Sequence, residues 1–101
     1  MTREQEIRIM LQNLFSKFAD RLAGHRVVLF GSRAQGRARL RSDFDLAVVG
    51  DEPLPLKDFF ALADELDELP TLYRFDWVDL ARDSEGFRSS ALEHVEVVYE
   101  N

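Results

Sequence analysis

Apolar residues recur at helical spacing over the first part of the chain. Between residues 3 and 23 they follow one another at steps of three and four positions, the period of a helix with one buried face. The stripe consists of Ile7, Leu11, Leu14, Phe18 and Leu22, and it is widened by Met10 and Phe15. Thr2 and Gln5 have the spacing of a capping box, and Gly24 is the expected end of the helix. The stripe predicts a helix packed on a sheet, although the same face would also suit a partner protein.

Two short runs of β-branched and aromatic residues follow, and they predict strands over residues 26–30 and 43–49. Gly31 and Ser32 end the first run and indicate a sharp turn into a short helix over residues 32–38. Glycine permits the tight turn, and serine can cap the helix. The N-terminus of such a helix presents free N–H groups and the positive end of its dipole, so it suits a phosphate group.

The second half of the chain continues the alternation of helix and strand. Two prolines indicate a loop over residues 50–55, and a helical stripe follows over residues 56–69. A strand is predicted over residues 73–80, a helix over 84–94 and a final strand over 96–100. This order predicts an α/β fold in which a small mixed β-sheet is backed by helices.

Size and composition suit one small domain over residues 1–101, since the chain has 101 residues and is 46% hydrophobic. The net charge of −6 and a pI of about 4.8 argue against direct nucleic-acid binding, which depends on basic patches, and suit a basic protein partner. Without cysteine there is no disulfide, thiolate metal site or cysteine nucleophile. No secretory signal or membrane-spanning run is visible, so a cytoplasmic protein without membrane contacts is expected.

Asp43 and Asp45 are the first candidate catalytic groups. Alternation along a strand places both carboxylates on one face, while Phe44 and Leu46 point to the other. Two carboxylates side by side repel each other unless a cation lies between them. Mg²⁺ is the expected cation, because it takes few protein carboxylates and completes its shell with water and substrate phosphates. The alternative is a turn at Ser42 and Asp43, with Asp45 as a solvated strand residue.

The sequence Gly31-Ser32-Arg33-Ala34-x-Gly36 with Ser42-Asp43-x-Asp45-Leu46 resembles the signature of the DNA polymerase beta nucleotidyltransferase superfamily. The closest form is its smallest branch, the minimal nucleotidyltransferase (MNT) domain. The resemblance covers nearly the whole chain, from the first helix to the tail. One departure is Gln35, where arginine is common, and it does not affect the carboxylates. The resemblance implies a polymerase-beta-like core and a nucleotidyl transfer reaction.

The resemblance also implies a third carboxylate on the next strand. Asp76 lies within an apolar strand, where a charge is costly unless it is paired or metal-bound. Phe75-Asp76-Trp77-Val78 is the better match to the family context, although Val78-Asp79-Leu80 also fits locally. We favour Asp76, because an aspartate such as Asp79 at a strand end commonly caps the next turn.

A site for ATP with two Mg²⁺ ions is implied by the same resemblance. Such ions stabilise in-line displacement at the α-phosphorus. The implied catalytic residues and metal ligands are Asp43, Asp45 and Asp76, and the implied nucleotide-binding residues are Gly31, Ser32 and Arg33. Asp76 would also accept the proton of the attacking hydroxyl. Four arginines in this region are either a solvated surface or a counter-charge for the triphosphate: Arg33, Arg37, Arg39 and Arg41.

The function implied by the resemblance is transfer of AMP to a partner protein. MNT domains are commonly antitoxins paired with a helical HEPN ribonuclease toxin, which they can neutralise by adding AMP to a hydroxyl. The chain is too short for the extra helical domain that encloses the acceptor in larger members, so the acceptor is expected on another chain. Two alternatives stay open: a non-catalytic antitoxin that docks to its toxin, and a small-molecule nucleotidyltransferase resembling antibiotic-modifying enzymes.

Overall fold

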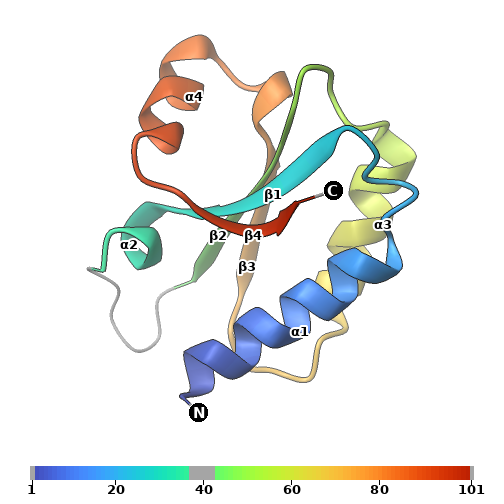
Figure 1. The fold of residues 1–101 in the computed structure, drawn as a ribbon, viewed down its shortest axis with the longest axis vertical. Coiled ribbons are helices and arrows are strands. Elements are labelled where there is room, and N and C mark those ends of the chain that lie inside the picture. The colour runs from blue at the N-terminus through green and yellow to red at the C-terminus, as the bar shows by residue number, and fades with distance from the viewer. Residues whose placement is uncertain (1, 37–42, 101) are drawn as a thin grey trace.

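The computed structural model of the chain describes residues 2–36 and 43–100, which form one sheet surrounded by helices. In chain order the elements are α1 (Arg3–Lys17), β1 (His25–Phe30), α2 (Gly31–Ala34), β2 (Phe44–Gly50), α3 (Leu56–Asp67), β3 (Phe75–Asp79), the 3-10 helix η1 (Leu80–Arg82), α4 (Glu85–Leu92) and β4 (Glu96–Glu100). Figure 1 shows their arrangement.

The strands of the sheet lie in the order β3-β2-β1-β4. β1 pairs antiparallel with both of its neighbours, whereas β2 and β3 pair in parallel. A parallel pair needs a crossover connection, and α3 lies in that connection. The arrangement confirms the predicted α/β class with a small mixed sheet.

The larger core lies between one face of the sheet and the helices α1 and α3. Its fully buried members come from alternate positions of β1 and β2 and from the apolar stripes of the two helices. They include Ile7, Leu11, Phe15, Val27, Leu29, Phe44, Leu46, Val48, Leu62 and Leu66. Each such side chain contributes about 1.5–3 kcal/mol by leaving water, so this layer fixes which face of each strand points inward.

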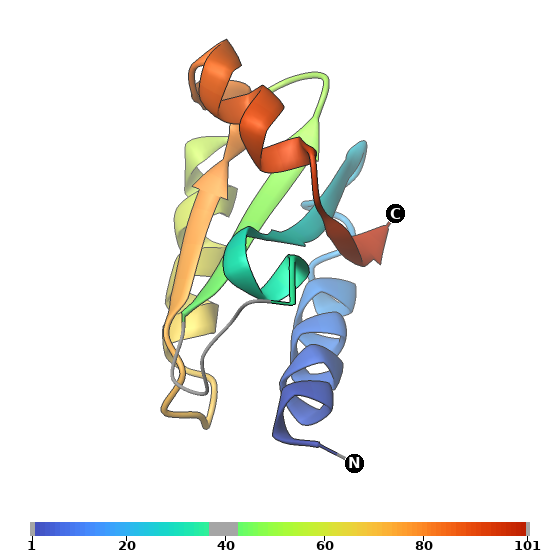
Figure 2. The same ribbon diagram turned by 90° about the vertical axis from the view of Figure 1, so that its left-hand side faces the viewer.

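The opposite face of the sheet carries a smaller core beneath η1 and α4. It consists of Val28, Phe30, Ala47, Leu80 and Ala91, with Val49, Val78, Leu92 and Val95 packed around them. Figure 2 shows α4 at the end of the molecule opposite the N-terminus of α1.

Trp77 lies at the centre of an aromatic stack on the α1–α3 side of β3. Its ring stacks on Phe15 and on Phe59, with centroids 5.7 and 5.6 Å away. Its indole N–H donates to the carbonyl oxygen of Phe59 at 3.0 Å. The stack joins β3 to both helices and holds the strand in place.

The first helix is shorter than the hydrophobic stripe predicts. The capping box of Thr2 and Gln5 is present, but α1 ends at Lys17 and not at Gly24. The chain then runs through turns, in which the Phe18 carbonyl oxygen accepts bonds from the N–H groups of Arg21 and Leu22. Leu22 is fully buried although it lies beyond the end of the helix, so it packs into the same core from a turn.

The predicted helix after β1 is also shorter and begins earlier. It starts at Gly31 with Phe30 as its N-cap and no side-chain cap, so the expectation that Ser32 caps it is wrong. Four residues build only a small dipole, so a phosphate here would depend on individual N–H groups. The expectations for Arg37, Arg39 and Arg41 lie outside the described residues.

The other elements lie where the sequence predicts them, with small changes in their bounds. α3 ends at Asp67, and β3 begins only at Phe75. α4 begins after Ser84, whose hydroxyl accepts from the N–H of Phe87 at 3.2 Å. β4 has the predicted bounds. In the part of the chain that the structure describes, no helix combines the length and apolar character needed to cross a membrane.

We expect Leu62→Ala to lower the free energy of unfolding by about 2–5 kcal/mol, because Leu62 is fully buried under the sheet and its removal leaves a cavity. Urea unfolding followed by circular dichroism measures the change. Leu72→Ala is the control, since Leu72 is 98% exposed and its truncation is expected to stay within about 0.5 kcal/mol. Equal losses in the two variants would contradict the assigned core.

Candidate active site

The start of β2 brings Asp43 and Asp45 to the end of the sheet where α2 leaves β1. Asp45 is the second residue of β2 and pairs with Phe30, the last residue of β1. Asp43 precedes the strand and is exposed. Phe44 and Leu46 lie in the larger core, so alternation points the side chain of Asp45 to the opposite face.

The parallel pairing of β2 with β3 places Asp76 beside Asp45. The two residues are partners in the ladder, so their side chains lie on the same face. A side-chain hydrogen bond joins the two carboxyl groups, which requires a proton on one of them. Burial, this hydrogen bond, and the charges of Asp76 and Asp43 raise the pKa of Asp45 from 3.8 to about 6. The structure thus brings together two predicted carboxylates and places the third within electrostatic reach.

Gly31 lies directly against the carboxylate of Asp45. A Cβ atom at position 31 would be 2.2 Å from Oδ2 of Asp45 and 3.1 Å from its Cγ. Gly31 also has φ of +74°, a conformation that side chains disfavour. Any other residue here would therefore strain the turn and push the carboxylate aside.

Arg33, expected to contact nucleotide, has its guanidinium enclosed by protein groups. Its side chain is only 5% exposed, and its Nη1 lies 3.8 Å from Oε1 of Glu4. The guanidinium carbon lies 4.0 Å from the ring centroid of Phe44 and 5.1 Å from that of Tyr73. The nucleotide role of Arg33 stays a prediction, while these contacts identify partners that sequence reasoning missed. The only sequence signal for these contacts was the aromatic character of Phe44, which begins β2, and of Tyr73, which shortly precedes β3.

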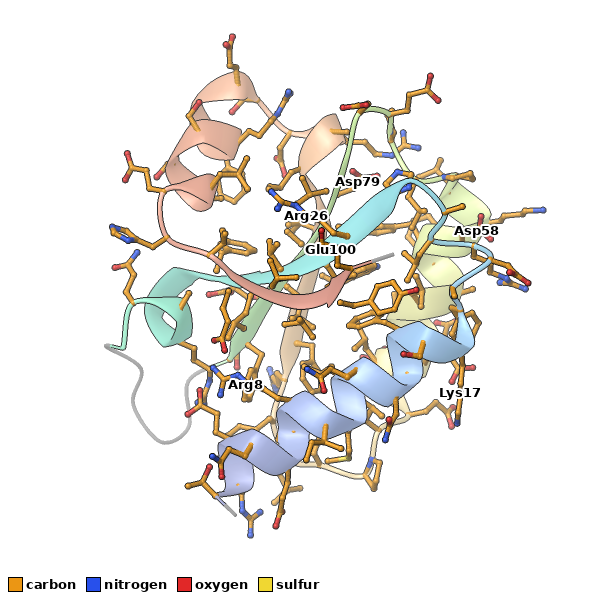
Figure 3. All side chains as sticks on the ribbon, in the orientation of Figure 1. Arg8, Lys17, Arg26, Asp58, Asp79 and Glu100 are labelled. Carbon is orange, nitrogen blue, oxygen red and sulfur yellow. The ribbon has the colours of Figure 1, made fainter. Side chains whose placement is uncertain are left out.

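Asp79, the competitor of Asp76, lies on the other face of β3 and is engaged by backbone groups. Its carboxylate accepts from the N–H of Leu54 at 2.8 Å and from the N–H of Ala81 at 3.1 Å. Nε of Arg82 lies 3.6 Å from the same carboxylate. Figure 3 labels Asp79 where β3 leads into η1. These contacts make Asp79 a capping residue that ties the loop before α3 to the end of β3.

The donor set fits a divalent cation in chemistry, although it is not arranged as a finished metal cage. Carboxylate oxygens are the ligands that Mg²⁺ prefers, and a cation would offset the mutual repulsion of the Asp45 and Asp76 carboxylates. Among residues 2–36 and 43–100, however, no three acidic or histidine side chains are grouped closely enough to hold a metal. Charge acts over longer distances than coordination, which explains how Asp43 affects Asp45 without completing such a group.

A hollow of about 470 Å³ opens beside the carboxylates. It is lined by Asp43 and Asp76, by the end of α3, by the connection from α3 to β3 and by the first residue of β3. Thr71, Tyr73 and Arg74 contribute to this wall. The sequence analysis did not single these residues out, because it treated Tyr73 and Arg74 as part of a strand over residues 73–80 and Thr71 carries no periodic signal. The hollow gives a substrate room next to Asp43 and Asp76.

We expect Asp76→Asn and Asp79→Asn to differ in their effects on stability and on ATP binding. Asp79→Asn should lower the free energy of unfolding by about 1–3 kcal/mol, because it disturbs a buried acceptor of two backbone N–H groups. Asp76→Asn should leave stability unchanged or higher, since it removes a repulsive charge, and should abolish Mg²⁺-dependent ATP binding. Urea unfolding and calorimetric titration measure the two properties. Loss of ATP binding with normal stability in Asp79→Asn would reverse the two assignments.

The raised pKa of Asp45 predicts a specific dependence of stability on pH. Between pH 3.8 and about 6 the folded protein holds a proton at Asp45 that the unfolded chain has released. Its contribution to stability is therefore present at low pH and is lost as pH rises through about 6. Unfolding of metal-free protein from pH 4 to 7.5 should show this loss, with stability levelling off above about pH 6, and Asp45→Asn should show a smaller one. Identical slopes in the two proteins would rule out the coupled pair.

Comparison with known proteins adds to this geometry. Residues 12–101 match the family model described as Polymerase beta, Nucleotidyltransferase. The chain is 44% identical over 62 residues to the probable protein adenylyltransferase MntA of Haemophilus influenzae, a match that covers 58% of this chain and 52% of that protein. The chain thus spans about half the length of this curated relative.

Solved structures with the same fold include toxin–antitoxin crystal structures. One, a toxin–antitoxin with AMP-PNP, is 25% identical with a TM-score of 0.59, over 89% of this chain and 73% of that chain. A mutant of the toxin–antitoxin MntA-HpeT is 21% identical with a TM-score of 0.61, over 93% of this chain and 73% of that chain, and shows the fold alone. With the family model matched over residues 12–101, the chain belongs to the polymerase beta nucleotidyltransferase family.

Proposed function

We propose that the protein transfers AMP from Mg-ATP to a hydroxyl of a partner protein. The observation that carries this proposal is the contact between Asp45 and Asp76, with Asp43 close enough to act on it. A fold does not keep two carboxyl groups in contact at an exposed strand end for stability, since their repulsion is unfavourable. A nucleotidyltransferase needs such a pair to hold a divalent cation at the phosphate.

The metal ligands we propose are Asp43, Asp45 and Asp76, for two Mg²⁺ ions. Bound Mg²⁺ would supply charge stabilisation at the α-phosphorus and lower the pKa of the attacking hydroxyl. Asp76 is exposed, so an acceptor hydroxyl can approach it and give up its proton there.

Phosphate binding is assigned in this proposal to the turn after β1. Gly31 lets the backbone pass close to Asp45, which would place its neighbouring N–H groups and Ser32 beside a nucleotide held at the carboxylates. Because the guanidinium of Arg33 is turned into the protein, we leave Arg33 out of the phosphate site.

The partner we propose is a toxin of the helical HEPN type, with this protein as its antitoxin in the cytoplasm. Support comes from the relatives, one named a probable protein adenylyltransferase and others solved as toxin–antitoxin structures. The net charge of −6 suits a basic protein surface, since opposite charges speed association and favour the correct partner.

The proposal is tested by incubating the protein with ATP, Mg²⁺ and a toxin encoded beside it, and by measuring the intact mass of the toxin. We expect one or more added AMP masses and loss of the toxin's ribonuclease activity. Asp43→Asn should add no mass, because it removes a charge that the metal requires. Asp51→Asn is the matched control, since this exposed aspartate lies beyond the other end of β2 and should behave as wild type.

Two outcomes would contradict the proposal. Neutralisation of the toxin by Asp43→Asn, with no mass added by the wild-type protein, would select a docking antitoxin. AMP transfer to an aminoglycoside-type hydroxyl compound, with no transfer to any protein, would select a small-molecule enzyme.

A further inference from the structure

We propose that Arg33 is a positioning residue, which holds the strand starts that carry the carboxylates instead of contacting the nucleotide. This inference rests on the proposed metal-dependent site and adds a structural cause for its geometry. It departs from the sequence expectation that Arg33 binds nucleotide.

The first step is the place of Phe44. Phe44 separates Asp43 from Asp45 in the chain, so fixing its ring and backbone fixes the base of both carboxylates. Its ring is fully buried, and the guanidinium carbon of Arg33 lies over it at 4.0 Å from the centroid. A cation on an aromatic face is held more strongly where water is excluded, and the Arg33 side chain is only 5% exposed.

The second step is the link to β3. The same guanidinium lies 5.1 Å from the ring centroid of Tyr73, two residues before β3. The rings of Phe44 and Tyr73 meet edge to face at 5.3 Å. The N–H of Phe44 donates to the carbonyl oxygen of Arg74 at 2.9 Å, which joins the two strand starts through their backbones. Arg33 therefore contacts both segments that lead to the Asp45–Asp76 pair.

The third step is the anchoring of the guanidinium itself. Glu4 on α1 lies 3.8 Å from Arg33 and 3.2 Å from Arg8. Arg8, labelled in Figure 3, also pairs with Glu96 of β4 at 2.6 Å. This chain of charges connects the far edge strand and α1 to Arg33. The planar guanidinium of Arg33 can stack on the rings and pair with Glu4 at the same time, whereas a lysine would offer only a compact charge without a planar face.

The test uses Arg33→Lys in the full chain without nucleotide, so that no phosphate contact can contribute. Amide hydrogen exchange at Phe44 should become at least about tenfold faster, because the strand starts open more often. Affinity for Mn²⁺, used as a probe of the carboxylates, should fall about tenfold, the lower end for residues that support metal ligands. The exposed α4 residue Arg88 gives the matched control Arg88→Lys, which should change neither quantity.

Two further variants keep the test decisive if Arg33→Lys folds poorly. Tyr73→Leu removes one ring from beneath the guanidinium, and Glu4→Gln removes its ionic partner on α1. Both should speed exchange at Phe44, and Glu4→Gln is the decisive one, because Tyr73 also contacts Phe44 directly and lines the hollow beside Asp76.

The outcomes separate this inference from the proposed function. Unchanged exchange and Mn²⁺ affinity in Arg33→Lys, with only the KM for ATP raised, would overturn it in favour of a phosphate contact. Faster exchange in a protein whose wild type binds no Mn²⁺ would support the positioning role and overturn the metal-dependent function.

Discussion

The structure depends on the parallel pairing of β2 with β3, because that register sets two like charges side by side. Asp45 and Asp76 are ladder partners, and strand periodicity leaves them no other face to occupy. The apolar residues on either side of them are committed to the α1–α3 core. The hydrophobic layer thus holds the two carboxyl groups together at the opposite face, where burial, their hydrogen bond and the neighbouring charges raise the pKa of Asp45.

Three different physical devices support this arrangement. Gly31 has no side chain, and this leaves the space that the carboxylate of Asp45 occupies. Asp79 accepts hydrogen bonds that join the loop before α3 to the end of β3. Arg33 contributes stacking on the aromatic rings at the strand starts. Gly31, Asp79 and Arg33 thus support the carboxylate pair through three different kinds of interaction.

The sequence predicted the elements that depend on periodicity, and it failed where tertiary contacts decide. Strand alternation correctly put Asp76 and Asp79 on opposite faces, and the family resemblance correctly put Asp76 with Asp45. It could not show that the first helix ends at Lys17, because Leu22 keeps its helical spacing while reaching the core from a turn. Nor could it show the enclosure of Arg33, since Phe44 and Tyr73 are distant in sequence and meet only in the folded sheet. The catalytic roles of the aspartates remain proposals.

Trp77 can serve as an intrinsic fluorescence probe of the site. It is the single tryptophan of the chain, and it follows Asp76 directly on β3. Stacked between Phe15 and Phe59, with its N–H bonded to a carbonyl, its indole sits in a rigid and largely apolar setting. A rearrangement of β3 on ligand binding would alter that setting, so intrinsic fluorescence can follow the site in unlabelled protein.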